Sequence, residues 1–186
     1  EKGILELLEA AKGVLKQFPN ARFLFVGPVD LEKPDALKPQ IARDYGIEQA
    51  CIFTGMRQDM PEFYALMDVF VLPSHRESFP RSPMEASAMK VPCVVTDIPG
   101  CRETVEAGRN GVLVPLGDVA ALKTVILDIL SNTEKARSMG EVGRAMALER
   151  FDEKKVFEKV KDEYARLLCE KGFELPVKYP TYTVSG

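Results

Sequence analysis

Two glutamates, Glu77 and Glu85, stand eight positions apart in residues 74–85, which read S-H-R-E-S-F-P-R-S-P-M-E. The stretch follows an apolar run at 68–72 and leads into a short helical pattern. A strand-to-helix turn of this kind is where open α/β sheets bind ligands. Backbone N–H groups at such a turn can face an anion. The stretch therefore places two carboxylates around a turn that is suited to an anionic ligand.

The same residues also have purely structural interpretations. Ser82, Pro83 and Glu85 match a capping box, with Ser82 as the N-cap and Glu85 as the third helical residue. On these residues alone, the capping box and a ligand role for Glu85 stay open and do not exclude each other. Glu77 is explained equally well as an ion-paired surface acid, and His75 as a local turn residue. Other candidates have ordinary explanations as surface charges or packing residues: Lys2, Arg57, Phe79, Met84 and Met89.

The elements that position these residues follow from hydrophobic periodicity. Five short apolar runs predict strands at 22–26, 51–54, 68–72, 92–96 and 112–114. Helical spacing predicts helices at 4–18, 41–45, 59–67, 83–89, 100–107, 118–130, 134–148 and 152–169. The strands are apolar throughout, as expected where both faces of a parallel sheet are covered. We therefore predict an α/β fold with a doubly wound, Rossmann-like parallel sheet and right-handed crossovers, in a domain over 1–170 with a tail at 171–186.

The residues directly after the strands should share one rim, because ligands of such sheets bind beyond the carboxyl ends of the strands. Gly27 and Gly55 follow the first two strands and leave room for a ligand to approach the backbone. The rim lacks G-x-G-x-x-G and G-x-x-x-x-G-K-[ST], so neither the dinucleotide nor the P-loop signature applies. We therefore predict a nucleotide-sized crevice at this rim that carries neither signature.

The composition excludes several other classes of protein. The 186 residues carry a net charge of −3 and no basic block, which argues against a nucleic-acid partner. A single His and four Cys without C-x-x-C spacing argue against a zinc site and predict reduced thiols in a cytosolic chain. No signal peptide and no bilayer-length apolar run are visible. The abrupt start at E-K-G, with no initiator Met and no leading strand, suggests a piece of a longer protein.

The order of short motifs carries a family resemblance. They are E-K-G at 1–3, F-V-G at 25–27, F-T-G at 53–55, A-L-M-D-V-F-V-L-P-S at 65–74, the E-x7-E pair, M-E-A-S-A-M at 84–89, V-P-C-V-V-T at 91–96, G-C-R-E at 100–103 and N-G-V-L-V-P at 110–115. Over residues 1–168 the chain resembles the C-terminal, donor-binding domain of retaining GT-B glycosyltransferases of family 4. E-x7-E is weak by itself, but the whole series in this order is specific.

The resemblance implies a nucleotide-diphospho-sugar as the donor. It assigns Glu85 to the ribose hydroxyls, Glu77 to the donor sugar and the reacting centre, and Lys2 to the pyrophosphate. Further donor-binding positions implied by the resemblance are Gly27, the base-binding Met56 and Arg57, and the loop residues Phe79, Pro80, Arg81 and Ser82. Members of this kind work without a bound metal ion, so no cofactor is expected.

Two departures from the family pattern matter. The common E-G-F-G is Glu77-Ser-Phe-Pro80 here, and Pro80 has no N–H to donate. The phosphate-binding arginine that lies upstream of E-K-G, and the acceptor-binding N-terminal domain, fall outside the sequence, so we expect this chain alone to transfer little or no sugar. The R-x-P-M-E variant resembles members that build bacterial surface polysaccharides, often on lipid-linked acceptors.

The predicted function is therefore the donor-binding domain of a retaining glycosyltransferase, with a UDP-sugar favoured over a GDP-sugar. Its partners would be the nucleotide-sugar and an acceptor sugar or lipid-linked sugar, with no nucleic acid. The full-length enzyme is expected in the cytoplasm, either free or peripheral to the inner face of the membrane. One alternative is a non-catalytic nucleotide-binding or protein-interaction module of the same fold. A sugar-nucleotide epimerase is another, which the E-x7-E context fits less well.

Overall fold

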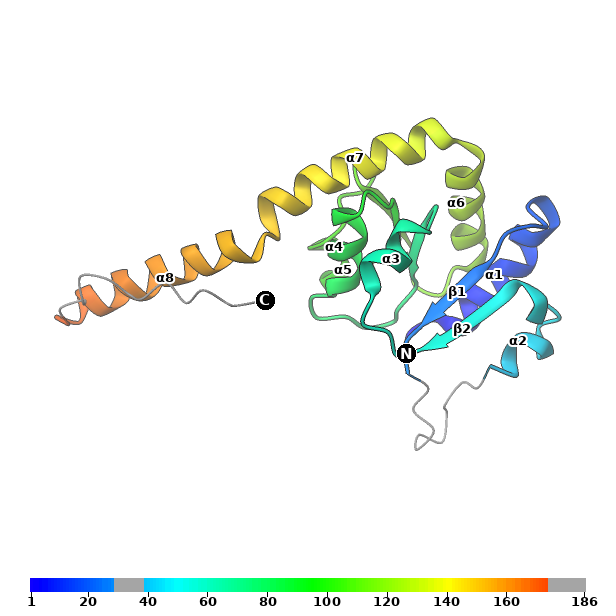
Figure 1. The fold of residues 1–186 in the computed structure, drawn as a ribbon, viewed down its shortest axis with the longest axis horizontal. Helices are drawn as coiled ribbons and strands as arrows, with labels where there is room; N and C mark the ends of the chain where they lie inside the picture. Colours follow the sequence, from blue (N-terminus) through cyan, green and yellow to red (C-terminus); the bar gives the residue numbers. More distant parts are fainter. Residues whose placement is uncertain (29–38, 174–186) are drawn as a thin grey trace. The chain divides into compact units, whose positions relative to one another are not determined.

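The computed structural model describes residues 1–28 and 39–173 (Figure 1). The segment 31–39 is polar and contains prolines, which predicts a loop, and most of it lies outside these ranges, as does most of the tail predicted at 171–186. The chain divides into two compact units, Glu1–Leu148 and Glu149–Gly186. The domain boundary predicted at residue 170 falls inside the second of these units and stays a prediction.

Strands and helices alternate along the first unit as predicted. The elements in chain order are α1 Ile4–Gln17, β1 Phe23–Val26, α2 Ile41–Asp44, the 3-10 turn η1 Glu48–Ala50, β2 Cys51–Gly55, α3 Met60–Ala65, β3 Phe70–Leu72, α4 Arg81–Ala88, β4 Cys93–Thr96, α5 Pro99–Arg102, β5 Gly111–Val114, α6 Val119–Ser131, α7 Thr133–Arg150 and α8 Glu153–Glu170. All five predicted strands are present. The α/β class is confirmed.

The strands pair in parallel, in two hydrogen-bonded sheets. β1 pairs with β2, and a second sheet has the order β3-β4-β5. Figure 1 shows β1 and β2 side by side, with α1 packed against them. Parallel strands end at the same edge of a sheet, so the loops after β1 and β2 share one rim and those after β3, β4 and β5 share another.

The core lies on both faces of the central strand β4, whose four residues are all buried. Cys93 and Val95 face a cluster that includes Tyr64, whereas Val94 faces a cluster formed largely by α1 and α6. Successive side chains of a strand point to opposite faces, so this split shows that the sheet is covered on both sides. This coverage of both faces explains why the strand residues are apolar throughout.

The capping box predicted at the start of α4 is wrong. The helix begins at Arg81, its N-cap is Pro80, and no side-chain capping hydrogen bond is found there among the described residues. Ser82 therefore lies inside the first turn, too late in the chain to cap it. The carboxylate of Glu85 accepts a hydrogen bond from the hydroxyl of Tyr64 instead.

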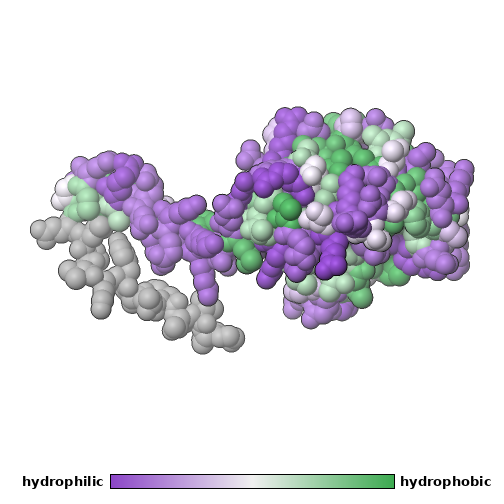
Figure 2. All heavy atoms as spheres, turned by 90° about the horizontal axis from the view of Figure 1, so that it is seen from above, coloured by the Kyte–Doolittle hydropathy of each residue, from purple (hydrophilic) through white to green (hydrophobic). Residues whose placement is uncertain are grey.

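Most of the described part of the second unit is the helix α8. This helix has no buried residue, and Figure 2 shows a largely hydrophilic face. Five of its large apolar side chains are at least 40% exposed: Val156, Phe157, Val160, Tyr164 and Leu167. No helix among the described residues combines the length and the apolar character needed to cross a membrane.

Candidate functional site

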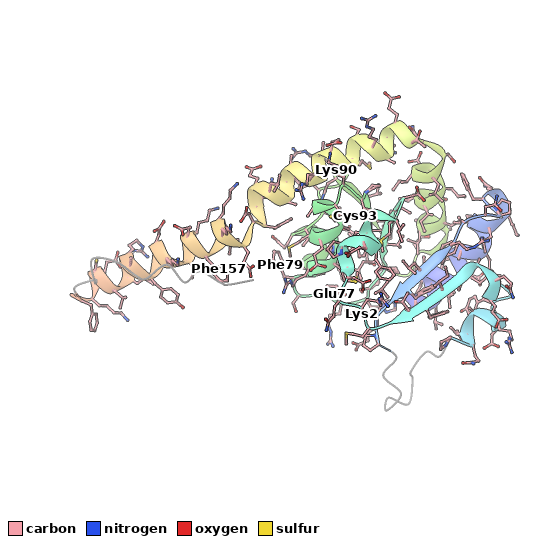
Figure 3. All side chains as sticks on the ribbon, viewed as in Figure 1. Lys2, Glu77, Phe79, Lys90, Cys93 and Phe157 are labelled. Atoms are coloured by element: carbon pink, nitrogen blue, oxygen red, sulfur yellow. The ribbon has the colours of Figure 1, made fainter. Side chains whose placement is uncertain are left out.

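The loop between β3 and α4 carries Glu77, and the structure places it against Lys2 from the start of the chain. Lys2 Nζ donates to Glu77 Oε1 at 2.7 Å, although 75 residues separate the two in sequence. The side chain of Glu77 is only 12% exposed, whereas that of Lys2 is 62% exposed. Figure 3 shows both labels together at this edge of the first unit. A nearly buried carboxylate and an exposed cation thus meet at one point.

The backbone of Glu77 is fixed from below by α5. A Cβ added to Gly100 would lie 2.2 Å from the carbonyl oxygen of Glu77, so only glycine fits beneath the loop. Cys101, the next residue of α5, is fully buried. Burial, and after it the charge of Glu77, raise the pKa of Cys101 to about 11, so its thiol is neutral at pH 7. The loop therefore rests on a close-packed support.

Glu85 has a different environment on α4. Tyr64, which is 2% exposed, donates its hydroxyl hydrogen to Glu85 Oε2 at 3.0 Å. Burial, followed by the charge of Glu85, raises the pKa of Tyr64, so the phenol stays protonated and remains a donor. The side chain of Glu85 is 44% exposed, and Arg81 Nε lies 3.8 Å from its other oxygen, Oε1. One carboxylate oxygen is thus anchored and the other remains accessible.

The rim after β1 and β2 carries the two glycines of the sequence prediction. Gly27 has a φ of 147° and Gly55 a φ of 68°, and a Cβ at either position would meet no atom of the described residues within 4 Å. The Gly27 N–H donates to the Gly55 carbonyl at 3.0 Å, which joins the ends of the two strands. Both glycines therefore leave open space at the carboxyl edge of this sheet.

Met56 and Arg57 follow on the same rim. Met56 is 72% exposed, but Arg57 is engaged within the chain. Its guanidinium makes two hydrogen bonds to Asp59, at 2.9 and 2.6 Å, and lies 5.1 Å from the centre of the Phe63 ring. The hydrogen bonds from Arg57 hold the pKa of Asp59 below its ordinary value, against the opposing effect of desolvation. Arg57 would have to leave this arrangement, or use its remaining N–H groups, to contact a ligand.

The loop residues before and within α4 are not alike. Phe79 is 54% exposed, Pro80 is buried as the N-cap, and Arg81 is exposed at the first helical position. Ser82 is half-buried in the first turn. Since no side chain caps α4, the first-turn N–H groups of Arg81 and Ser82 are available to an anion.

The structure therefore brings together part of the predicted site: Lys2 with Glu77, and Arg81 with Glu85. Sequence reasoning missed Tyr64 as the partner of Glu85 and Gly100 as the support of Glu77. The motif G-C-R-E marked Gly100, but no local pattern links Tyr64 to a residue 21 positions later. Among the described residues, no three His, Cys, Asp or Glu side chains are grouped so that they could hold a metal ion.

A separate open hollow of about 700 Å³ lies at the other end of β1 and β2, next to their first residues. Its lining includes Lys16, Arg22, Arg43 and Ile47, from α1, the start of β1 and the region around α2. The hollow lies at the amino ends of β1 and β2, whereas the loop that carries Glu77 follows the carboxyl end of β3. The two places are therefore far apart. The hollow is not where the predicted site residues meet.

A parallel α/β domain with paired carboxylates and a lysine beyond its strands has the architecture of the GT-B glycosyltransferases. The sequence model of the family described as "Glycosyl transferases group 1" matches residues 1–146, and the chain belongs to this family. The resemblance read from the motifs is confirmed.

Two relatives and one solved structure illustrate the likeness. The capsular polysaccharide biosynthesis glycosyltransferase CapM of Staphylococcus aureus is 28% identical over 91% of this chain and 44% of its own length. The UDP-Gal:alpha-D-GlcNAc-diphosphoundecaprenol alpha-1,3-galactosyltransferase of Escherichia coli is 28% identical over 92% of this chain and 44% of its own. HepE of Anabaena, solved in complex with UDP, is 27% identical with a TM-score of 0.83 over 89% of this chain and 45% of its own. The chain thus spans less than half the length of these relatives.

Proposed function

We propose that this chain is the donor-binding part of a retaining glycosyltransferase that takes a sugar from a nucleotide-diphospho-sugar. The observation that carries the proposal is the 2.7 Å contact between Lys2 and Glu77 on the site loop. It unites a cation able to hold a diphosphate with a carboxylate able to face the sugar. Both lie next to the start of α4, whose N–H groups face no capping side chain.

Lys2 and Glu77 have complementary roles in this proposal. Breaking the sugar–phosphate bond leaves positive charge on the sugar and adds negative charge to the departing diphosphate. Lys2, exposed and flexible, binds the diphosphate and stabilises that added charge. Glu77, fixed by the packing of Gly100, faces the sugar and favours the positive charge that develops there. The ion pair seen here is the arrangement of these groups before the donor binds.

Glu85 binds the ribose of the donor. Its oxygen Oε2 accepts a hydrogen bond from Tyr64, while Arg81 lies 3.8 Å from Oε1. A carboxylate with accessible lone pairs accepts hydrogen bonds from both hydroxyls of a ribose. Open space at Gly27, together with Met56 and Arg57, would receive the base, and the Phe79–Ser82 loop would border the diphosphate and sugar.

The relatives support the choice of donor and acceptor class. The E. coli enzyme is named for a UDP-sugar donor and a diphosphoundecaprenol-linked acceptor, and HepE was solved with UDP. For this chain we propose a UDP-sugar in preference to a GDP-sugar and an acceptor in bacterial polysaccharide synthesis that is itself a sugar or a lipid-linked sugar. We further propose that acceptor binding requires residues beyond this chain and that no metal cofactor takes part. The enzyme would work in the cytoplasm, where a lipid-linked acceptor would bring it to the inner face of the membrane.

The test is nucleotide binding by the 186-residue chain. UDP, GDP and uridine are titrated against the wild type, Glu85→Ala and the control Glu141→Ala by calorimetry and thermal unfolding. Glu141 is a suitable control because it pairs with Lys90 on the surface, away from the site. At a hundredfold excess over its dissociation constant, UDP should stabilise the wild type by about 2.7 kcal/mol, a rise of roughly 5–10 °C in Tm.

Glu85→Ala should weaken UDP binding about thirtyfold, because two charge-assisted hydrogen bonds are lost. Glu141→Ala should bind like the wild type. If no nucleotide binds the wild type at millimolar concentration, the proposal is wrong, and a non-catalytic interaction module becomes the better account. If UDP binds but Glu85→Ala binds it equally well, the ribose is held elsewhere.

A further inference from the structure

The first residues of the chain and the loop after β3 are joined by more than the Lys2–Glu77 pair. Gly3 has a φ of 67°, and a Cβ there would lie 2.0 Å from the carbonyl oxygen of Pro73. The backbones of the two segments are therefore in direct contact. Only glycine allows both the left-handed conformation and this approach.

His75 contacts the first segment twice. Its backbone N–H donates to the Glu1 carbonyl at 2.8 Å, and its Nε2 lies 2.5 Å from Glu6 Oε1. Glu6 belongs to the first turn of α1, so the imidazole connects the site loop to a helix 69 residues earlier. The Glu6 side chain is 21% exposed and that of His75 47% exposed, so the pair lies partly out of solvent.

These contacts determine where Lys2 lies. Its neighbours Glu1 and Gly3 are each held against the loop, at His75 and Pro73, and Glu77 is two residues beyond His75. The segment 1–3 therefore runs beside the loop in a fixed alignment. Lys2 comes opposite Glu77 because of that alignment, while its own side chain stays largely exposed.

We propose that His75 and Glu6 form a clamp between the site loop and α1 that positions Lys2 and Glu77 for the diphosphate of the donor. His75 is a positioning residue, because it acts through the loop and not on the ligand. The clamp rests on the proposed function, since the ligand whose binding it serves is the one proposed above. Charged groups near the clamp include the amino group of Glu1, which acts on Glu6, and the side chains of Glu1 and Arg76, which lie 3.5 Å apart.

If the His75–Glu6 pair had only a structural role, removing it would leave the affinity for UDP unchanged. If the pair positions the site, removing it weakens UDP binding, so the affinity distinguishes the two roles. The variants are His75→Gln, Glu6→Gln, the double variant and His75→Lys, in which the lysine places an ammonium donor within reach of Glu6. The control is Glu9→Gln, which removes another carboxylate of α1 that pairs with Lys12 and not with the loop. UDP affinity is measured by calorimetry on the 186-residue chain, and Tm is measured on the same samples.

His75→Gln and Glu6→Gln should each bind UDP about threefold more weakly, the size expected for loss of a partly exposed pair. The double variant should lose no more than either single one, because both remove the same contact. His75→Lys should bind UDP within about twofold of the wild type, because the lysine can still pair with Glu6. Glu9→Gln should bind UDP like the wild type. The signals of the single histidine in an NMR spectrum should shift in Glu6→Gln but not in Glu9→Gln.

The outcomes separate the clamp from the proposed function. If the wild type binds UDP and the His75→Gln and Glu6→Gln variants bind it equally well, even with a lowered Tm, the clamp is overturned and the proposed function stands. If losses in the two single variants add up in the double variant, the residues act independently and the clamp is overturned as well. If the wild type binds no nucleotide, the proposed function falls and the clamp falls with it.

Discussion

Glu77 and Glu85 are eight residues apart, yet the chain surrounds them differently. Glu77 is almost buried and faces a cation, Lys2. Glu85 is nearly half exposed and is held by a neutral hydroxyl, that of Tyr64. If an anionic ligand binds the exposed Lys2, the Lys2–Glu77 pair opens and the surroundings of Glu77 change. Glu85 keeps its geometry, because a buried phenol orients it. The contrast suggests that the first glutamate responds to the donor and the second is preorganised for it.

The largest effect should come from removing the cation on the Glu77 side. Lys2→Met keeps much of the side-chain length but leaves no charge for the diphosphate, so UDP should bind about tenfold more weakly while uridine binding is unchanged. Calorimetry with both ligands measures this difference. Lys12→Met is the matched control, because Lys12 lies on α1 and pairs with Glu9. An equal loss for UDP and uridine would show that Lys2 does not recognise the diphosphate.

On the Glu85 side, the corresponding change is Tyr64→Phe. It removes a hydroxyl that is buried and bonded to a carboxylate, so the chain should lose about 1 kcal/mol of unfolding free energy. Affinity for UDP and for uridine should fall together, about two- to threefold, because the ribose is common to both and a freed Glu85 is less well oriented. Urea unfolding and calorimetry measure the two effects. Tyr45→Phe, at the remote hollow, should leave both affinities as they are.

Neutralising Glu77 should strengthen UDP binding, whereas the change at Glu85 should weaken it. In Glu77→Gln, Lys2 no longer has an anionic partner and the diphosphate no longer faces a nearby carboxylate, so UDP should bind about twofold more tightly. A titration at low and at high salt measures this gain, which should shrink as salt screens the charges. Weaker UDP binding in Glu77→Gln would mean that the two glutamates act alike.

The smallest effect concerns acid stability through Glu6. Burial raises the pKa of Glu6, but hydrogen bonds from its own backbone and from His75 outweigh it, so the net pKa lies below the ordinary value. A carboxyl group with a lowered folded pKa stabilises the protein above its unfolded pKa and loses this contribution as pH falls through the folded value. The wild type should therefore exceed Glu6→Gln by about 0.5 kcal/mol at pH 5.5 and by almost nothing near pH 3. A difference that does not change with pH would exclude an electrostatic clamp.

The order of strands and helices could be predicted because it depends on local patterns. Apolar runs such as 92–96 and the turn glycines mark their own elements, and E-x7-E places two carboxylates on one strand-to-helix connection. Gly46, which lies just after α2, has a left-handed φ of 72°, a conformation that glycine adopts readily at the end of a helix. Local sequence also predicted that β4 would be covered on both faces.

The contacts that define the site could not be predicted in the same way. Tyr64 reaches Glu85 and His75 reaches Glu6 through packing between elements that are distant in sequence, and no periodicity encodes such pairs. The error at α4 has a similar origin, because Ser82 and Glu85 fit a local capping rule, while Pro80 begins the helix earlier and Tyr64 takes the carboxylate. The division of the strands into two hydrogen-bonded sheets likewise depends on tertiary packing.

The most direct test is a crystal structure of this chain with UDP, in which two contacts are measured. The account predicts Lys2 Nζ within about 3.2 Å of a diphosphate oxygen and Glu85 within the same distance of the ribose hydroxyls, with the Lys2–Glu77 pair opened. The account would be contradicted by UDP bound in the hollow lined by Arg22 and Arg43, or by a diphosphate out of reach of Lys2 while the lysine still pairs with Glu77.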